Sequence, residues 1–226
     1  MMTAQLLVWI LALATSPAEP QRLHPGAEAL STADAPYPLD GIVRWLPAKG
    51  PMHCPKVPLV RYAGDVLPYA SAVMVHPEFA KHLALFEAVI RDTAVEVYGR
   101  APRSIRHLGT LNCRRIRTWP ELLSEHGLGN GIDIAGFDLP ALRKRDPAHA
   151  TTPPALRGVL KIRLAQHWQV PEHAGEVANV HARFLHTLAA RLTERRDIFR
   201  VLLGPAYPGH KDHFHFDCAP WRLVSI

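Results

Sequence analysis

The sequence has no hydrophobic run long enough to cross a lipid bilayer. Its apolar stretch near the N terminus, Leu6–Ala14, is well short of the roughly 20 residues that a membrane-spanning helix needs. Ala12, Leu13 and Ala14 have the small-x-small pattern of a signal-peptide cleavage site, although no lysine or arginine precedes Arg22. We therefore expect residues 1–14 to be a signal peptide and the protein to be exported to the periplasm or cell envelope, with no transmembrane segment.

Cysteine is also scarce, because the chain has three, Cys54, Cys113 and Cys218. No pair has the Cys-x-x-Cys spacing, so a zinc site built on thiolates is disfavoured. In an exported protein an odd number implies one disulfide and one free thiol, or a partner outside the chain. Cys113 and Cys218 are both expected to end strands that border one cleft. We therefore prefer a Cys113–Cys218 disulfide, although spacing alone leaves the pairing open.

Acidic residues are fewer than basic ones. The chain has 26 Lys and Arg against 20 Asp and Glu, a net charge of +6, which favours an anionic partner such as an acidic cell envelope. The basic residues are scattered rather than set in a stripe with aromatic residues, so nucleic acid is not expected as a partner. A length of 226 residues with 48% hydrophobic content fits one domain with a sizeable core. Proline-rich residues 15–40 are expected to be a flexible linker, and residues 41–226 the domain.

The elements predicted from periodicity and breakers indicate an α+β fold, because no regular βαβ repeat is present. We expect a mostly antiparallel sheet with flanking helices and a zinc cleft over the sheet. Two helices are expected, one starting at His76-Pro77 and ending at Gly99, the other over Glu176–Arg195. The expected strands are Ser104–Arg114, Gly131–Phe137, Gly158–Trp168, Ile198–Leu203 and Asp212–Cys218.

Two short motifs carry the candidate chemistry: residues 124–133, Ser-Glu-His-Gly-Leu-Gly-Asn-Gly-Ile-Asp, and residues 210–217, His-Lys-Asp-His-Phe-His-Phe-Asp. In a strand, residues two apart share a face. His213, His215 and Asp217 would then line a cleft while the intervening phenylalanines enter the core. Together with His126 and Asp133 from the first motif, they offer histidines and carboxylates in a pattern that fits a catalytic zinc site, which takes three protein ligands and leaves the fourth position to water. Six histidines that are not clustered are expected to be surface or core residues: His76, His82, His149, His173, His181 and His186.

These motifs resemble the zinc peptidases that cut bonds to D-amino acids in bacterial peptidoglycan, the D-Ala-D-Ala carboxypeptidases and penicillin-insensitive murein endopeptidases. Over roughly residues 54–221 the chain looks most like the bacterial extensin-like C-terminal domain family. The resemblance implies Zn²⁺ as the cofactor, with His126, Asp133 and His215 as ligands. The chain departs from the pattern in two respects: Gly131 stands where relatives usually have Ala, and no Glu-x-x-His precedes the last ligand.

The resemblance also implies roles for residues that are not ligands. His213 corresponds to the active-site histidine of the murein endopeptidases, and Arg114 to the arginine that faces the developing oxyanion, although the adjacent Arg115 leaves open which of the two faces the cleft. Three further residues are expected around the ligands: His210, Asp217 and Ser124. Asp217, on the strand face of His215, is a candidate to orient an imidazole, and an ordinary strand-end aspartate is equally compatible.

The expected function is hydrolysis of bonds to D-amino acids in peptidoglycan stem peptides or cross-links. His213 would act as general base, or stabilise the tetrahedral state, and Arg114 would stabilise the oxyanion. The alternative is a zinc-bearing cell-envelope binding module without catalysis. Peptidoglycan is the expected partner in both cases.

Overall fold

The computed structural model describes residues 23–32 and 34–226. The predicted signal peptide and the first part of the predicted linker lie outside the described residues. Within the described part of the chain, neither long helix is long and apolar enough to span a bilayer.

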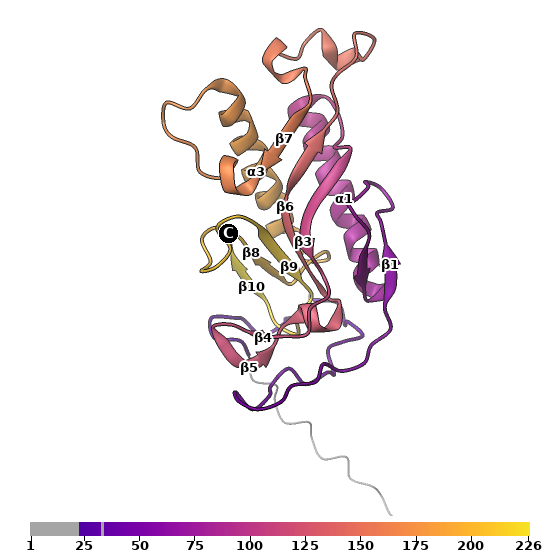
Figure 1. Ribbon diagram of the computed structural model, residues 1–226, viewed down its shortest axis with the longest axis vertical. Helices are drawn as coiled ribbons and strands as arrows, with labels where there is room; N and C mark the ends of the chain where they lie inside the picture. Colours follow the sequence, from indigo (N-terminus) through magenta and orange to yellow (C-terminus); the bar gives the residue numbers. More distant parts are fainter. Residues whose placement is uncertain (1–22, 33) are drawn as a thin grey trace, which may run out of the picture.

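The described chain mixes short strands with two long helices (Figure 1). The strands are β1 (Val60–Tyr62), β2 (Val73–Val75), β3 (Ser104–Gly109), β4 (Arg115–Ile116), β5 (Trp119–Leu123), β6 (Gly131–Leu139), β7 (Leu160–Arg163), β8 (Val201–Leu203), β9 (Phe214–Asp217) and β10 (Leu223–Ser225). The helices are α1 (Pro77–Tyr98), α2 (Leu164–His167) and α3 (Glu176–Glu194), with short 3-10 turns η1 (Glu125–Leu128), η2 (Pro147–His149) and η3 (Pro154–Leu156).

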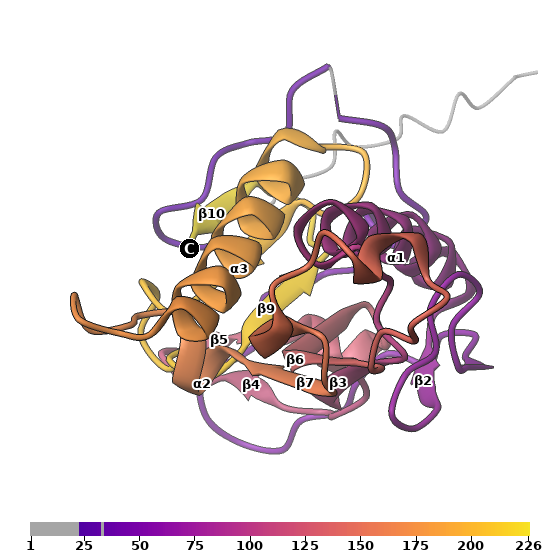
Figure 2. The same ribbon diagram turned by 90° about the horizontal axis from the view of Figure 1, so that it is seen from above.

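The main sheet has the strand order β10-β8-β9-β6-β3, and β7 also pairs with β6. All of its pairings are antiparallel except that between β10 and β8. Helices α1 and α3 pack against each other and cover one face of the sheet (Figure 2). The α+β class with a mostly antiparallel sheet and flanking helices is confirmed.

Alternation along β9 places its two phenylalanines in the core beneath the helices. Phe214 and Phe216 are fully buried, and the ring of Phe216 stacks on Phe199 with centroids 5.0 Å apart. Ile132 and Ile134 of the neighbouring strand β6 are also fully buried. Burying each such side chain stabilises the fold by about 1.5–3 kcal/mol. The opposite face of β9 is therefore free to carry polar groups.

The long helices begin and end close to where their sequence signals predict. The Nδ1 of His76 accepts the backbone N–H of Glu78 at 3.2 Å, Pro77 is the first helical residue of α1, and Gly99 ends it with φ 67°. Glycine adopts that left-handed conformation without steric cost. The second helix, α3, ends within one residue of its predicted boundary.

Two predicted strands are shorter than expected. Gly158–Trp168 is a strand only over β7, because the chain turns into α2, where Trp168 packs edge-on against Phe214 at 5.3 Å. Ser104–Arg114 is a strand only to Gly109, after two irregularities in its pairing with β6. The start of α2 thus ends the first of these strands, and the second ends where its pairing with β6 becomes irregular.

The described part of the predicted linker packs against the domain. Tyr37 and Leu39 are buried in the core, and the carboxylate of Asp34 lies 2.7 Å from the guanidinium of Arg196. A bridge between Glu28 and the residue before β10 adds backbone pairing. The prolines prevent a helix here, but they leave the apolar side chains free to dock. We call residues 23–32 and 34–46 the N-terminal arm.

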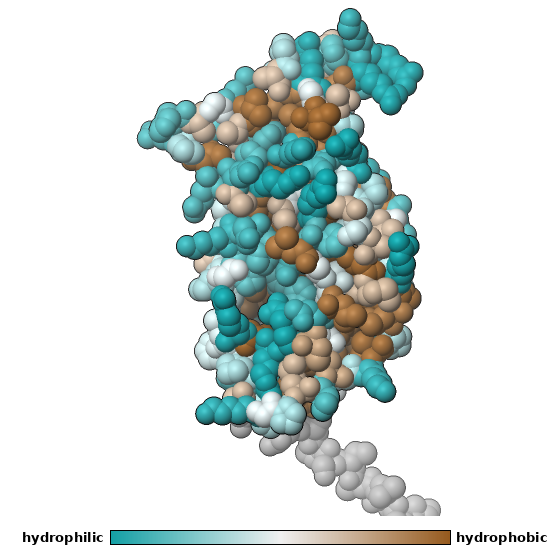
Figure 3. Space-filling model, viewed as in Figure 1, coloured by the Kyte–Doolittle hydropathy of each residue, from teal (hydrophilic) through white to brown (hydrophobic). Residues whose placement is uncertain are grey.

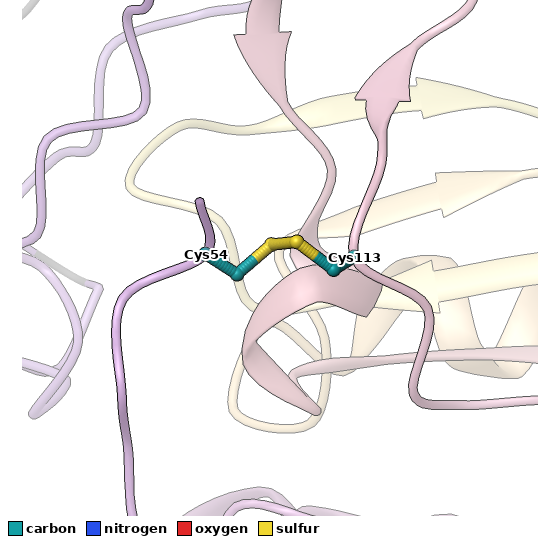
Figure 4. Close-up of a disulfide and its surroundings, with 2 residues drawn as sticks. All are labelled: Cys54 and Cys113. Atoms are coloured by element: carbon teal, nitrogen blue, oxygen red, sulfur yellow. A yellow bond between two sulfur atoms is a disulfide. The ribbon is translucent and has the colours of Figure 1, made fainter. Parts of the chain in front are cut away.

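The disulfide joins Cys54 to Cys113, with the two Cα atoms 5.8 Å apart (Figure 4). The predicted Cys113–Cys218 pairing is therefore wrong. Cys218 is a buried free thiol whose Sγ lies 3.6 Å from the carbonyl oxygen of Ile198. It continues the alternation of the two buried phenylalanines of β9, so its side chain points into the core rather than toward the cleft.

Exposed hydrophobic side chains gather beside the β1–β2 ribbon on an otherwise largely hydrophilic face (Figure 3). Val60, Val66 and Met74 are exposed there. None of the three lines the cleft described next.

Candidate metal centre

The three predicted zinc ligands come together at one point. The Nε2 of His126 lies 3.2 Å from Oδ1 of Asp133 and 3.1 Å from Nδ1 of His215. The Asp133 Oδ1 and the His215 Nδ1 are 2.9 Å apart. Among the described residues, these three are the one group of His, Cys, Asp and Glu side chains close enough together to hold a metal ion, with ligand atoms within 4.8 Å of one another. Two imidazole nitrogens and a carboxylate oxygen form a donor set that suits Zn²⁺.

Three different elements supply the ligands. Asp133 on β6 and His215 on β9 are direct cross-strand partners in the antiparallel register, so their side chains share a face. His126 comes from the 3-10 turn η1, which ends at Gly129 with φ 59°. A side chain at Gly127 would come within 2.6 Å of the Cys54 Sγ, so the turn packs directly on the disulfide.

Hydrogen bonds on the outer nitrogens turn both histidines toward the centre. The Nδ1–H of His126 donates to the carbonyl oxygen of Thr110 at 2.9 Å, and the Nε2–H of His215 donates to Oδ2 of Asp217 at 2.7 Å. The remaining nitrogen of each ring therefore faces the other ligands. Such outer contacts fix ring orientation in metal sites. The expected contact between Asp217 and an imidazole is present, and the other oxygen of Asp217 accepts the Ala219 N–H at 2.9 Å.

The charge state of the metal-free cluster follows from its carboxylates. Burial lowers the pKa of His215, but Asp133 and Asp217, on its two nitrogens, outweigh burial and raise the pKa to about 10. Burial raises the pKa of Asp133, and the hydrogen bonds from His126 and His215 overcome this and hold it well below its usual range. The metal-free cluster thus keeps a proton where a cation would bind, and metal binding would release it.

A buried polar network lies directly behind the ligands. The guanidinium of Arg44 donates from Nε to Oε1 of Glu125 at 2.8 Å and from Nη2 to Oε2 at 3.2 Å. Oε2 also accepts the side-chain amide of Asn130 at 2.6 Å, and the Asn130 oxygen accepts the Tyr37 hydroxyl at 2.6 Å. Glu125 precedes one ligand, and Asn130 lies three residues before another. The network therefore locks the N-terminal arm onto the turn that positions His126.

A cleft of about 300 Å³ opens over the cluster, with Asp133 and His215 in its wall. His213 lies beside them, with Nε2 3.8 Å from Oδ1 of Asp133 and Nδ1 2.8 Å from Oδ1 of Asp212. The ring of His210 is 4.8 Å from that of His213. Burial, followed by the charges of His215 and His213, lowers the pKa of His210 to about 4.

Arg114, rather than Arg115, lines the cleft, which resolves the alternative left open by the sequence. Arg115 donates from Nη1 to the carbonyl oxygen of Pro120 at 2.7 Å. Ser124 also lines the cleft, and its backbone N–H donates to the carbonyl oxygen of Arg114 at 3.1 Å. All of the predicted site residues except the Cys113–Cys218 pair are thus found at or beside this cleft.

Sequence reasoning missed two groups at the site. Arg117 lines the cleft, and so does His24 of the N-terminal arm, whose ring lies edge-on to Trp119 with centroids 5.7 Å apart. Burial lowers the pKa of His24. Neither residue belongs to a motif, and the segment holding His24 was expected to be a linker, so no local pattern indicated either one.

Comparison with known proteins gives one similarity. Residues 44–146 match the family described as extensin-like protein C-terminus. No curated protein and no solved structure matches the chain. The matched stretch includes Arg114, His126 and Asp133, and it ends before His213 and His215. The expected resemblance is therefore supported over the first motif and less than half of the chain.

Proposed function

We propose that the protein is a zinc-dependent peptidase of the bacterial cell envelope that hydrolyses bonds to D-amino acids in peptidoglycan stem peptides or cross-links. The observation that carries the proposal is the convergence of His126, Asp133 and His215 at a cleft whose wall includes Asp133 and His215, with both imidazoles oriented by outer hydrogen bonds. The match to the extensin-like family over residues 44–146 is consistent with it. An exported, basic protein would meet this anionic polymer directly.

The residues present fit a zinc ion. His126, Asp133 and His215 would hold it, and two neutral imidazoles with one carboxylate would leave a net charge of +1 at the site. When bound, zinc lowers the pKa of a water molecule and polarises a carbonyl group. The carboxylate of Asp217 keeps His215 oriented.

The remaining roles belong to side chains that are not ligands. Asp212 binds Nδ1 of His213, which leaves Nε2 as the nitrogen facing the cluster. In this position His213 would take a proton from the attacking water and pass it to the departing amine. Arg114 would supply a fixed positive charge for the oxygen that becomes negative as the carbonyl is attacked. Together the two residues distinguish a peptidase from a site that only binds zinc.

The decisive experiment is digestion of purified peptidoglycan with the zinc-loaded protein, followed by chromatography of released muropeptides. We expect wild-type protein to release products and the His213→Ala variant to keep its zinc while losing about 10²–10⁴-fold in rate. His173→Ala, which removes an exposed histidine outside the cleft, is the matched control and should match wild type.

The outcome also separates the alternative function. A wild-type protein that binds peptidoglycan but releases nothing under zinc-replete conditions would replace the peptidase with a zinc-bearing binding module. Loss of zinc in the His213→Ala variant would mean that His213 is itself a ligand.

A further inference from the structure

The acidic side chains of the cleft wall have hydrogen-bond partners, whereas two of its arginine side chains do not. Each of its carboxylates is already engaged: Asp133 by His126 and His215, Asp217 by His215 and the Ala219 N–H, and Glu125 by Arg44 and Asn130. By contrast, the guanidinium groups of Arg114 and Arg117 make no hydrogen bond or ion pair with any residue that the structure describes. The charge still available in the cleft is therefore positive.

Arg117 lies at the far end of the hairpin from the metal cluster. It occupies the two-residue connection between β4 and β5, and its Nη2 would be 3.0 Å from a Cβ built on Gly209. The guanidinium thus reaches from the hairpin to the loop that precedes β9. Arg114, by contrast, is joined through its carbonyl oxygen to Ser124, two residues from ligand His126.

The hairpin that carries Arg117 in its turn is held to the rest of the fold by buried contacts of β5. Leu122 of β5 is fully buried and forms a bridge with Trp45 of the N-terminal arm. Leu122 also belongs to a small hydrophobic cluster with Val201 and Leu203 of β8. The planar guanidinium fork is itself pre-organised, so little conformational entropy is lost for each hydrogen bond that it forms with a planar anion.

We propose that Arg117 binds a free carboxylate of the peptide substrate and so selects peptides that carry one near the bond to be cut. This inference rests on the proposed peptidase function and adds a recognition element to it. A guanidinium binds a carboxylate through two parallel N–H···O bonds, which gives both affinity and orientation. The carboxylate can be the peptide's C terminus or an acidic side chain, and both have the same chemistry.

Three synthetic peptides ending in D-Ala-D-Ala test the inference and distinguish the sources. The first has a free C terminus and no acidic side chain, the second is its C-terminal amide, and the third is an amide that carries one acidic side chain. Binding to the zinc-loaded full-length protein is measured by calorimetry, and hydrolysis of the same peptides by chromatography. Arg117→Met, Arg117→Lys and wild type are compared, with Arg115→Met as the matched control, since Arg115 lies on the same hairpin and does not line the cleft.

Arg117→Met should weaken binding of at least one carboxylate peptide by about tenfold to a hundredfold and leave the plain amide unchanged, since a charge-assisted bond is lost. Arg117→Lys should recover part of the affinity, and Arg115→Met should behave as wild type. The peptide that is affected identifies the source of the carboxylate.

Equal binding of all three peptides by wild type and Arg117→Met overturns the inference, and so does a wild type that binds none of them. The proposed function fails separately, if carboxylate peptides bind through Arg117 but none is hydrolysed.

Discussion

Replacing Glu125 by glutamine should both destabilise the protein and weaken its metal site. The Arg44 side chain is fully buried, and both oxygens of Glu125 accept hydrogen bonds from it. The amide of Glu125→Gln cannot accept on both sides, and its NH₂ group would face a donor from Arg44 or Asn130. Removing one partner of a buried ion pair typically costs about 3–5 kcal/mol, because the other charge stays buried without compensation.

That loss is a large part of the total free energy of unfolding of a domain, about 5–15 kcal/mol. At about 2–4 °C per kcal/mol for a chain of this size, the melting temperature should fall by roughly 6–20 °C. Because Glu125 is adjacent to ligand His126, zinc affinity should fall by about 10- to 100-fold, as for other outer contacts of metal ligands.

The assays are urea unfolding of the metal-free protein and competition for zinc with a chromophoric chelator. Glu96→Gln is the control, since its ion pair with Arg191 is largely exposed and should be worth at most about 1 kcal/mol. The double variant Arg44→Met, Glu125→Leu should lose less stability than the two single changes added together. A loss below about 1 kcal/mol in Glu125→Gln would refute the reasoning that this pair holds the arm to the metal-bearing turn.

The remaining predictions concern the metal, the thiols, pH and export. Mass spectrometry should find one zinc per chain in wild type and none after alanine replacement of His126, Asp133 or His215. Unchanged zinc stoichiometry in all three variants would reject the ligand assignment. A thiol titration of the unfolded, unreduced protein should find one free thiol, that of Cys218. Reduction of the Cys54–Cys113 disulfide should lower the unfolding free energy by about 2–4 kcal/mol. Alkylation of Cys54 without reductant would contradict the Cys54–Cys113 pairing. Burial, then the charge of His167, lowers the pKa of His181 from 6.5 to about 4. The stability that neutral His181 contributes is therefore intact above pH 6.5 and is lost as the pH falls toward 4, because the unfolded chain takes up the proton first. From pH 7.5 to 5 the unfolding free energy of wild type should fall by about 2 kcal/mol more than that of His181→Gln, and equal losses would exclude His181 as the cause. N-terminal sequencing of protein from its native cell should begin after Ala14 or a few residues later, whereas an intact Met1 in a cytoplasmic fraction would exclude export.

Local signals account for the parts of the fold that were predicted closely. His76 and Pro77 begin α1, and Gly99 ends it, because a cap needs only neighbouring backbone groups. Alternation over β9 separates His215 and Asp217 from the two buried phenylalanines, because a strand places side chains on opposite faces by its own geometry. The same alternation puts Cys218 on the core face. The predicted Cys113–Cys218 disulfide was wrong because it relied on the expected positions of both residues at strand ends and not on the face to which Cys218 points.

The sequence by itself determined the types of the main elements, because periodicity and caps are properties of short segments, and the family resemblance of its two motifs pointed to the three residues that converge. Only the tertiary structure decided which distant segments meet. It pairs Cys54 with Cys113, docks the N-terminal arm through Arg44 onto Glu125, and turns Arg114 and Arg117 toward the cleft. These choices depend on burial and on the satisfaction of buried polar groups across the whole fold, and no short stretch of sequence records them.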